Sequence, residues 1–218
     1  MSGDGRYSEV LAFPSRAELA RRLPPLALGL VVLGTSVALS VRADLGVSPW
    51  DVLHQGIARA TGLSLGTVVV LVGVAVLVAW IPLRQRAGIG TLLNTLSVGA
   101  VADLGLWLVP RPEPLAGRIA LLVASVVGFG VGAGLYIGAG LGPGPRDGLM
   151  TAIAARGHRV WAVRTVMELS VLAVGFALGG TVGVGTVVIA FAIGPLTHLA
   201  LRRFHLPVSD AAPDVLGE

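Results

Sequence analysis

The chain has 218 residues and a formal net charge of +4, with 54% hydrophobic and only 13% charged residues. Soluble domains carry about 25% charged residues, so this composition, with a mean hydropathy of +0.84, indicates a membrane protein. The length suits a single compact unit. Cysteine is absent, which excludes a disulfide framework, a thiolate metal site and a cysteine nucleophile.

The positive charge does not indicate nucleic-acid binding. Every cationic residue is an arginine, and the arginines lie beside apolar segments and not in a patch with aromatic residues. Such arginines are typical of topology signals in membrane proteins. We therefore expect the lipid bilayer, and no nucleic acid, as a partner.

Six apolar segments are long enough to cross a bilayer, which takes about 20 helical residues. The last charge-free run, from Leu169 to Leu201, is too long for one helix, and Gly179 and Gly180 divide it into two spans. In chain order the predicted spans are 23–41, 60–83, 89–109, 119–141, 161–178 and 184–201. They make one transmembrane domain, 23–205, between polar tails at 1–22 and 206–218.

The arginines between the spans predict the orientation. Cytoplasmic loops of membrane proteins carry an excess of arginine and lysine. Most arginines of this chain lie on the cytoplasmic side when both termini are placed there. We therefore expect a multi-pass protein of the bacterial plasma (inner) membrane. The cytoplasmic side then receives Arg16, Arg21, Arg22, Arg84, Arg86, Arg146, Arg156, Arg159, Arg202 and Arg203, and the outside receives Arg42, Arg59, Arg111 and Arg118.

The sequence contains an internal repeat. A shift of 96 positions aligns 34–58 with 130–154, and Leu, Gly, Pro and Asp recur in the same order. A shift of 95 positions aligns Gly88, Gly90, Thr91 and Gly99 with Gly183, Gly185, Thr186 and Gly194. An odd number of spans per half places the second half upside down, and a segment with such a twin does not fit a cleaved secretory signal. The prediction is an all-α, polytopic transmembrane helical bundle of about six spans, in two inverted three-span repeats at about 24–109 and 119–204.

Each half also contains a short helix that begins with proline, after the motif Leu-Gly-x-x-Pro-x-Asp. The helices expected at 49–60 and 145–156 are too short to cross a bilayer, so each is re-entrant or interfacial. In the first copy Asp51, Gln55 and Arg59 share one face, with His54 beside them. The residues of the two helix starts are Gly46, Ser48 and Pro49, and Gly142, Gly144 and Pro145.

Asp51 and Asp147 allow two interpretations. In the first, they only complement the free N–H groups and the dipole of a helix that Ser48 or Gly144 caps. In the second, the helix starts face a polar cavity at the repeat interface, where transporters hold their substrates, and the aspartates bind a cation or proton. The candidate substrate- or ion-binding residues are Asp51, Asp147, His54, Gln55, Asn94 and Glu168.

The remaining polar residues do not form a recognisable catalytic motif. Arg164 and Glu168 lie one helical turn apart, so they either neutralise each other or serve a function inside the membrane. Asn94, Asp103 and His198 either bond between helices or face a cavity, and they are too few for a metal site. We therefore expect no metal, no cofactor and no enzymatic activity.

Four segments carry a resemblance to a known family. They are the motif Leu-Gly-x-x-Pro-x-Asp, 61–67 (Thr-Gly-Leu-Ser-Leu-Gly-Thr), 80–83 (Trp-Ile-Pro-Leu) and 88–91 (Gly-Ile-Gly-Thr). With 179–180, 183–186 and 194–195 in the second half, they resemble the YczE branch of the YczE/YitT-type bacterial membrane proteins over about 24–205. The resemblance implies a multi-pass membrane protein, with a transport or regulatory role suggested for the family and no residue roles to carry over.

Three functions are compatible with these features. The first is a small secondary transporter of an unidentified small-molecule or ion substrate, with its site at the repeat interface. The second is a membrane scaffold or regulatory protein that acts through protein contacts, for which glycine and alanine faces and a homodimer would matter. The third is the substrate-binding membrane subunit of an ATPase-driven transporter. The direction in which Asp51 and Asp147 face distinguishes the first from the others.

Overall fold

The computed structural model describes residues 15–204, which form eight helices and no strand. The prediction of an all-helical membrane bundle is confirmed, because six helices are long and apolar enough to cross a membrane. These six are α1 (Arg16–Ala43), α3 (Leu65–Leu83), α4 (Ile89–Leu108), α5 (Leu115–Gly138), α7 (Val160–Ala177) and α8 (Val184–Phe204). The two short helices are α2 (Pro49–Thr61) and α6 (Pro145–Ala154). The predicted C-terminal tail, 206–218, and most of the N-terminal tail lie outside the described residues.

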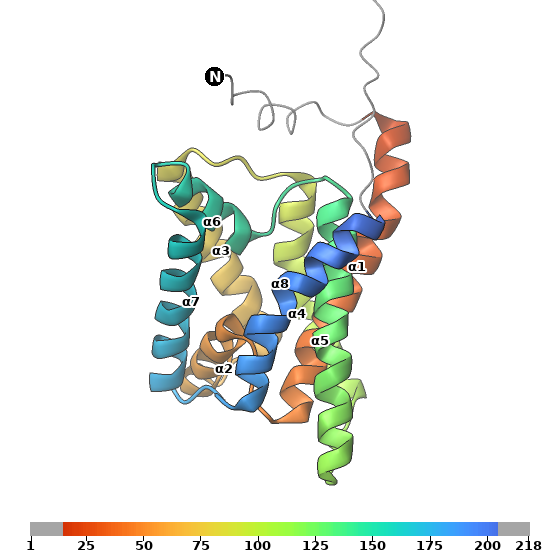
Figure 1. Ribbon diagram of the computed structural model, residues 1–218, viewed down its shortest axis with the longest axis vertical. Coiled ribbons are helices and arrows are strands. Elements are labelled where there is room, and N and C mark those ends of the chain that lie inside the picture. Colours follow the sequence, from red (N-terminus) through yellow and green to blue (C-terminus); the bar gives the residue numbers. More distant parts are fainter. Residues whose placement is uncertain (1–14, 205–218) are drawn as a thin grey trace, which may run out of the picture.

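The long helices alternate in direction, so Arg16 and Phe204 lie at the same end of the bundle (Figure 1). We call this end the termini end. Helix α6 lies there, whereas α2 lies towards the opposite end. Equivalent helices of the two halves run in opposite directions, since α1 leaves the termini end and α5 approaches it.

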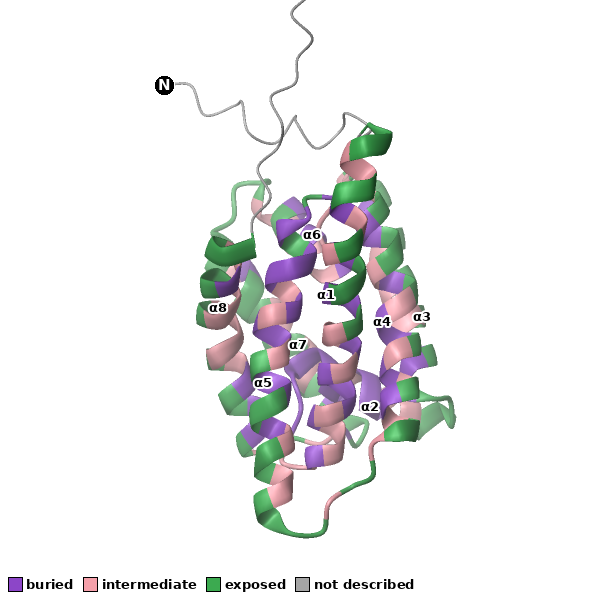
Figure 2. Ribbon diagram, turned by 90° about the vertical axis from the view of Figure 1, so that its right-hand side faces the viewer, coloured by how far each residue is buried: buried purple, intermediate pink, exposed green. Residues whose placement is uncertain are grey.

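Helices α1 and α5 form the centre of the bundle. Half of the residues in the most apolar stretch of each helix are buried, whereas only 11% are buried in the corresponding stretch of α7. Their backbones approach closely at two glycines, because a Cβ on Gly29 would lie 2.8 Å from the carbonyl oxygen of Gly132. Exposed residues cover the outward sides of the long helices (Figure 2), and Trp107 and Phe191 are 80% and 79% exposed. In a bilayer these apolar outward faces contact lipid tails.

Helix α1 begins earlier than the apolar pattern predicts. Ser15 and Glu18 form a capping box, in which the Ser15 side chain accepts from the Glu18 backbone N–H and the Glu18 side chain accepts from Ser15. Residues 16–22, which we assigned to the polar tail, therefore belong to α1. The difference arises because hydropathy detects the lipid-crossing part of a helix and not its polar first turns.

The second span also begins later than predicted, at Leu65 and not at residue 60. Gly62 ends α2 in the left-handed conformation, with φ +73°, and Ser64 caps α3 by accepting from the Thr67 N–H. Helix α6 ends at Ala154, two residues before the predicted end. These corrections move helix boundaries by a few residues and leave the order of elements unchanged.

Residues that the internal repeat aligns make the same contact twice. The Gly185 N–H donates to the Leu45 carbonyl at 2.7 Å, and the Gly90 N–H donates to the Leu141 carbonyl at 2.7 Å. The loop before each short helix is thus bonded to the first turn of the last helix in the other half. The close approach needs glycine, because a Cβ on Gly183 would overlap the Leu45 carbonyl.

Candidate functional site

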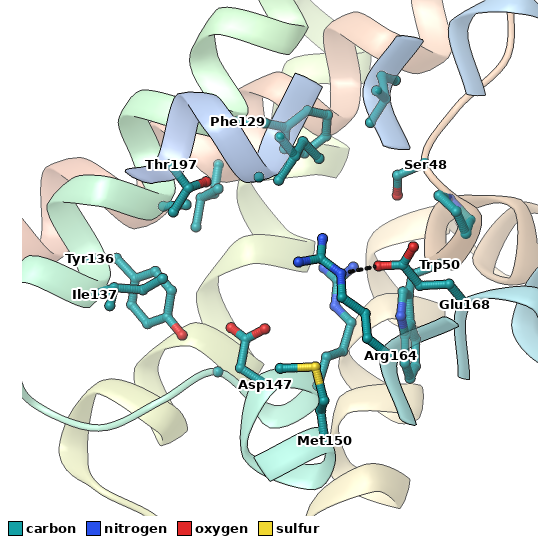
Figure 3. Close-up of a pocket in the computed structure, with 18 of the residues that line it drawn as sticks. Ser48, Trp50, Phe129, Tyr136, Ile137, Asp147, Met150, Arg164, Glu168 and Thr197 are labelled. Carbon is teal, nitrogen blue, oxygen red and sulfur yellow. Dashed lines mark hydrogen bonds and ion pairs between the residues drawn. The ribbon is translucent and has the colours of Figure 1, made fainter. Parts of the chain in front are cut away.

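A cavity of about 400 Å³ lies inside the bundle, between α1, α5 and α8 on one side and α2, α6 and α7 on the other (Figure 3). One wall is apolar, with Val37, Phe129 and Ile193. The opposite wall holds the first residues of both short helices together with Arg164 and Glu168 of α7. The cavity therefore combines a small set of polar groups with an apolar surface, as ligand sites do.

The start of α2 contributes Ser48, Pro49 and Trp50 to the cavity lining, but Asp51 does not line it. Asp51 is 1% exposed. Ser48 Oγ donates to Asp51 Oδ2 at 2.5 Å and accepts from the Asp51 N–H at 3.2 Å, while His54 Nδ1 lies 3.2 Å from Oδ1. The local geometry of Asp51 is that of a residue which stabilises the helix start.

The start of α6 differs, although it carries the same motif. Gly144 occupies the N-cap position and has no side chain to bond with Asp147. Asp147 is an exposed residue that lines the cavity. Its carboxylate points into the cavity (Figure 3), and it forms no ion pair with the described residues. Asp147 is thus available to a ligand.

Two hydroxyl groups face the same region without a hydrogen-bond partner. Tyr136 is 3% exposed, and its hydroxyl points towards Asp147 (Figure 3) without a hydrogen bond of ordinary geometry to the described residues. Thr197 Oγ1 on α8 is also buried and unpartnered. A Cβ on Gly144 would lie 2.6 Å from the Tyr136 hydroxyl, so the glycine leaves room for this hydroxyl.

Arg146 links the two short helices across the cavity. Its guanidinium lies over the Trp50 ring, 5.4 Å from the centroid, at a distance suited to a cation–π contact. Arg146 lines the cavity and makes no ion pair with the described residues. The contact fixes the face of the guanidinium and leaves its N–H edges free.

Arg164 and Glu168 on α7 form an ion pair, with Nε and Oε1 2.9 Å apart. Both residues also line the cavity, with side chains that are 45% and 29% exposed. The two charges thus neutralise each other at the cavity wall, and a function for the pair inside the membrane stays a prediction. Asn94 of α4 and His198 of α8 also contribute to the lining.

Other predicted site residues are bonded elsewhere. The Gln55 carbonyl oxygen accepts from the Thr181 N–H at 3.0 Å, so Gln55 holds the connection between α7 and α8. His54 lines a recess of about 30 Å³ that shares Trp50, Asn94 and Arg146 with the cavity. Of the helix-start residues, Ser48, Pro49, Gly144 and Pro145 line the cavity, and Gly46 and Gly142 lie in the loops before the helices, with φ of +106° and +120°. Ligand binding by Asp51, His54 and Gln55 stays a prediction.

Asp103 accepts from Ser64 Oγ at 2.5 Å and from the Gly66 N–H at 2.7 Å. It therefore stabilises the start of α3. Among residues 15–204 no group of three His, Asp or Glu side chains is placed to hold a metal ion.

Sequence reasoning missed three lining residues, Trp50, Tyr136 and Arg146. Tyr136 is a polar group in an otherwise apolar span, and Arg146 follows the proline of a short helix. These positions could have indicated that Tyr136 and Arg146 belong to the site, because polar or ionisable residues inside a membrane bundle often have a function.

With this geometry in hand, comparison with known proteins defines the family. Residues 20–202 match the model of a family described as a family of unknown function, DUF6198. The chain belongs to this family. It is 38% identical to the uncharacterized membrane protein YczE of Bacillus subtilis over 185 residues, or 83% of each chain. The resemblance to YczE-type membrane proteins is therefore confirmed.

Two further relatives are also bacterial proteins. An uncharacterized protein of Haemophilus influenzae is 38% identical over 187 residues, which cover 84% of this chain and 86% of that one. The uncharacterized protein YyaS of Bacillus subtilis is 26% identical over 177 residues. No solved structure matches the chain. Six apolar helices and a membrane-protein relative assign the chain to a membrane.

Proposed function

We propose that this protein is a small secondary transporter, and that the cavity between the two short helices is its solute site. One observation carries the proposal. The starts of α2 and α6, one from each half, meet at one interior cavity in which Asp147 is accessible. The proposal assigns the solute a path across the membrane and no chemical conversion.

General features of transporters support this function. Many are inverted repeats whose substrate site lies at the repeat interface, where the N-termini of broken or short helices point at the substrate. In this chain equivalent helices run in opposite directions, and the two loop contacts are reciprocal. We therefore infer that the halves are an inverted repeat, and that they rock about the cavity.

The cavity position supports an assignment of the open side. Its lining on α5 and α8 extends to Ile137 and Leu201, near the ends of these helices at the termini end. The lining from α2, at Ser48 and Pro49, is at the far side. We infer that the described state faces the termini end, and that this end is the cytoplasmic face of the plasma membrane, since the arginine-rich connections lie there.

A cysteine reporter tests the proposal without knowledge of the solute, because the natural chain has no cysteine. Gly194 lines the cavity, and a Cβ added there meets nothing within 4 Å. In Gly194→Cys, a membrane-impermeant maleimide should label the thiol from the termini side, and also from the opposite side as the protein samples its other state. Right-side-out and inverted vesicles separate the two directions.

The matched control lies on the same helix. Phe191 is 79% exposed on an outward face, so Phe191→Cys should stay unlabelled from both sides because its thiol lies in lipid. Labelling of Gly194→Cys from one side only would contradict transport. That result would favour a regulatory membrane protein or the membrane subunit of an ATPase-driven system.

A further inference from the structure

We propose that the cavity selects a small zwitterion, a solute that carries both a carboxylate and a primary ammonium group, as an amino acid does. The inference rests on the proposed function and names the substrate class of the same site. Some charged side chains of the cavity form ion pairs within the protein and others do not, and this difference points to the zwitterion.

Four acidic or arginine side chains line the cavity, and two of them neutralise each other. Arg164 and Glu168 are paired at 2.9 Å, whereas Arg146 and Asp147 have no ion pair with the described residues. Neighbours in a helix do not face each other, and Arg146 and Asp147 form none of the ion pairs found among the described residues. Each can therefore take a direct ion pair from a ligand.

A ligand with a single charge would leave the other protein charge unmatched. Burying an unpaired charge is costly, and the cost falls when an opposite charge is supplied with good geometry. A cation alone would match Asp147 and leave Arg146 unmatched, and an anion alone would do the reverse. A zwitterion matches both.

The carboxylate of the solute fits the Arg146 side of the site. Trp50 holds the face of the guanidinium at 5.4 Å, and its N–H edges can bind a carboxylate by two parallel hydrogen bonds. The N-termini of α2 and α6 open at the same cavity, and the partial positive charge of a helix start favours an anion.

The ammonium group fits the Asp147 side. The Tyr136 hydroxyl is buried, points towards Asp147 and makes no hydrogen bond of ordinary geometry with the described residues. An unpartnered buried hydroxyl is unfavourable, and this one indicates a ligand independently of the helix starts. An ammonium group can donate to both the Asp147 carboxylate and the Tyr136 oxygen.

The remaining surface limits the rest of the solute. Phe129, Ile193 and Met150 give the cavity apolar walls, and the volume of about 400 Å³ is at the small end of ligand sites. An amino acid with a short or medium side chain therefore fits better than a peptide or a sugar phosphate.

The test is a thermal-shift assay on the full-length protein in detergent, with tryptophan fluorescence as the readout. The probes are L-alanine, L-glutamine and β-alanine, with propionate and propylamine as analogues that lack one charge. Because a ligand that binds only the folded state raises its stability, at least one zwitterion should raise Tm by about 4 °C at saturation. Propionate and propylamine should leave Tm unchanged. The inference is overturned if no zwitterion raises Tm, or if either analogue raises it equally.

Four variants locate the effect, each scored as the shift that the active probe causes relative to the same variant without probe. Arg146→Gln and Asp147→Asn should each abolish the shift. Arg156→Gln and Asp44→Asn, which change charges outside the cavity lining, should retain it. A shift that survives in both cavity variants would also overturn the inference.

The two proposals fail separately. If the probes cause no shift but Gly194→Cys is labelled from both sides, the substrate class is wrong and transport stands. If a zwitterion binds but labelling occurs from one side only, the cavity is a binding site for that class in a protein that does not transport.

Discussion

The starts of α2 and α6 are the same motif in two halves, yet their aspartates have different surroundings. Asp51 is 1% exposed and bonded to Ser48, with His54 beside it, whereas Asp147 is accessible from the cavity. The difference begins one turn earlier, where Ser48 has a hydroxyl and Gly144 has none. The same sequence motif thus holds one carboxylate in hydrogen bonds at the helix start and leaves the other facing the cavity.

The two short helices also pack by opposite means. Gly175 of α7 lies against the α2 backbone at Val52 and Leu53, whereas Gly148 of α6 receives the Trp80 ring of α3. Trp80 is 2% exposed, and its Nε1 donates to the Pro145 carbonyl at 3.1 Å. The first short helix thus packs backbone against backbone, and the second packs around an aromatic ring.

A substitution at Gly148 tests the packing of α6, and we expect it to cause the largest loss of stability. A Cβ at this position would overlap the buried Trp80 ring, which has no room to move, so Gly148→Ala should lower the free energy of unfolding by about 3 kcal/mol. The measurement is thermal or chemical denaturation in detergent. Gly194→Ala is the matched control, because its Cβ meets nothing within 4 Å. Equal stability of the two variants would refute the account of α6 packing.

The contrast between the aspartates predicts a smaller effect. Asp51→Asn weakens bonds to Ser48 and His54 in a buried site and should cost about 1–2 kcal/mol. Asp147→Asn changes a cavity-facing group without an ion pair and should cost less than about 0.5 kcal/mol. Comparing the Tm of both variants checks this. If Asp147→Asn were the more destabilising change, the two helix starts would have their roles exchanged.

Tyr136 should give the smallest effect on stability. Its hydroxyl makes no hydrogen bond of ordinary geometry with the described residues, so Tyr136→Phe should change the free energy of unfolding by less than about 0.5 kcal/mol. Denaturation of the ligand-free protein provides the measurement. A loss above about 1 kcal/mol would mean that the hydroxyl is bonded within the protein.

Hydropathy and turn chemistry predicted most of the fold. Runs without charge located the six spans, and Pro49 and Pro145 located the short helices, because proline is favoured at the first position of a helix. The polar first turns of α1 were missed because Ser15 and Glu18 act through capping, to which hydropathy is blind. Spans, helix starts and caps depend on residues that are close in sequence, so a single sequence can reveal them.

The site was harder to predict, because the direction of a side chain depends on neighbours that are distant in sequence. Asp51 and Asp147 have the same local motif, and the hydrogen bond from Ser48 to Asp51 together with the cavity beside Asp147 shows which carboxylate is accessible. The periodicity of α2 correctly placed Gln55 and Arg59 on one face, but that face contacts the connection between α7 and α8 and not the cavity. Packing between the two halves thus decides whether a polar face of a short helix meets the cavity or another segment of the chain.

The two reciprocal loop contacts also bear on how the chain is made. Leu45 leaves the ribosome long before Gly185, its bonding partner in the last helix. The Leu45 carbonyl, in the loop between α1 and α2, therefore lacks this partner until α8 has been made. A chain that stops before α8 would lack this bond between the first loop and the last helix.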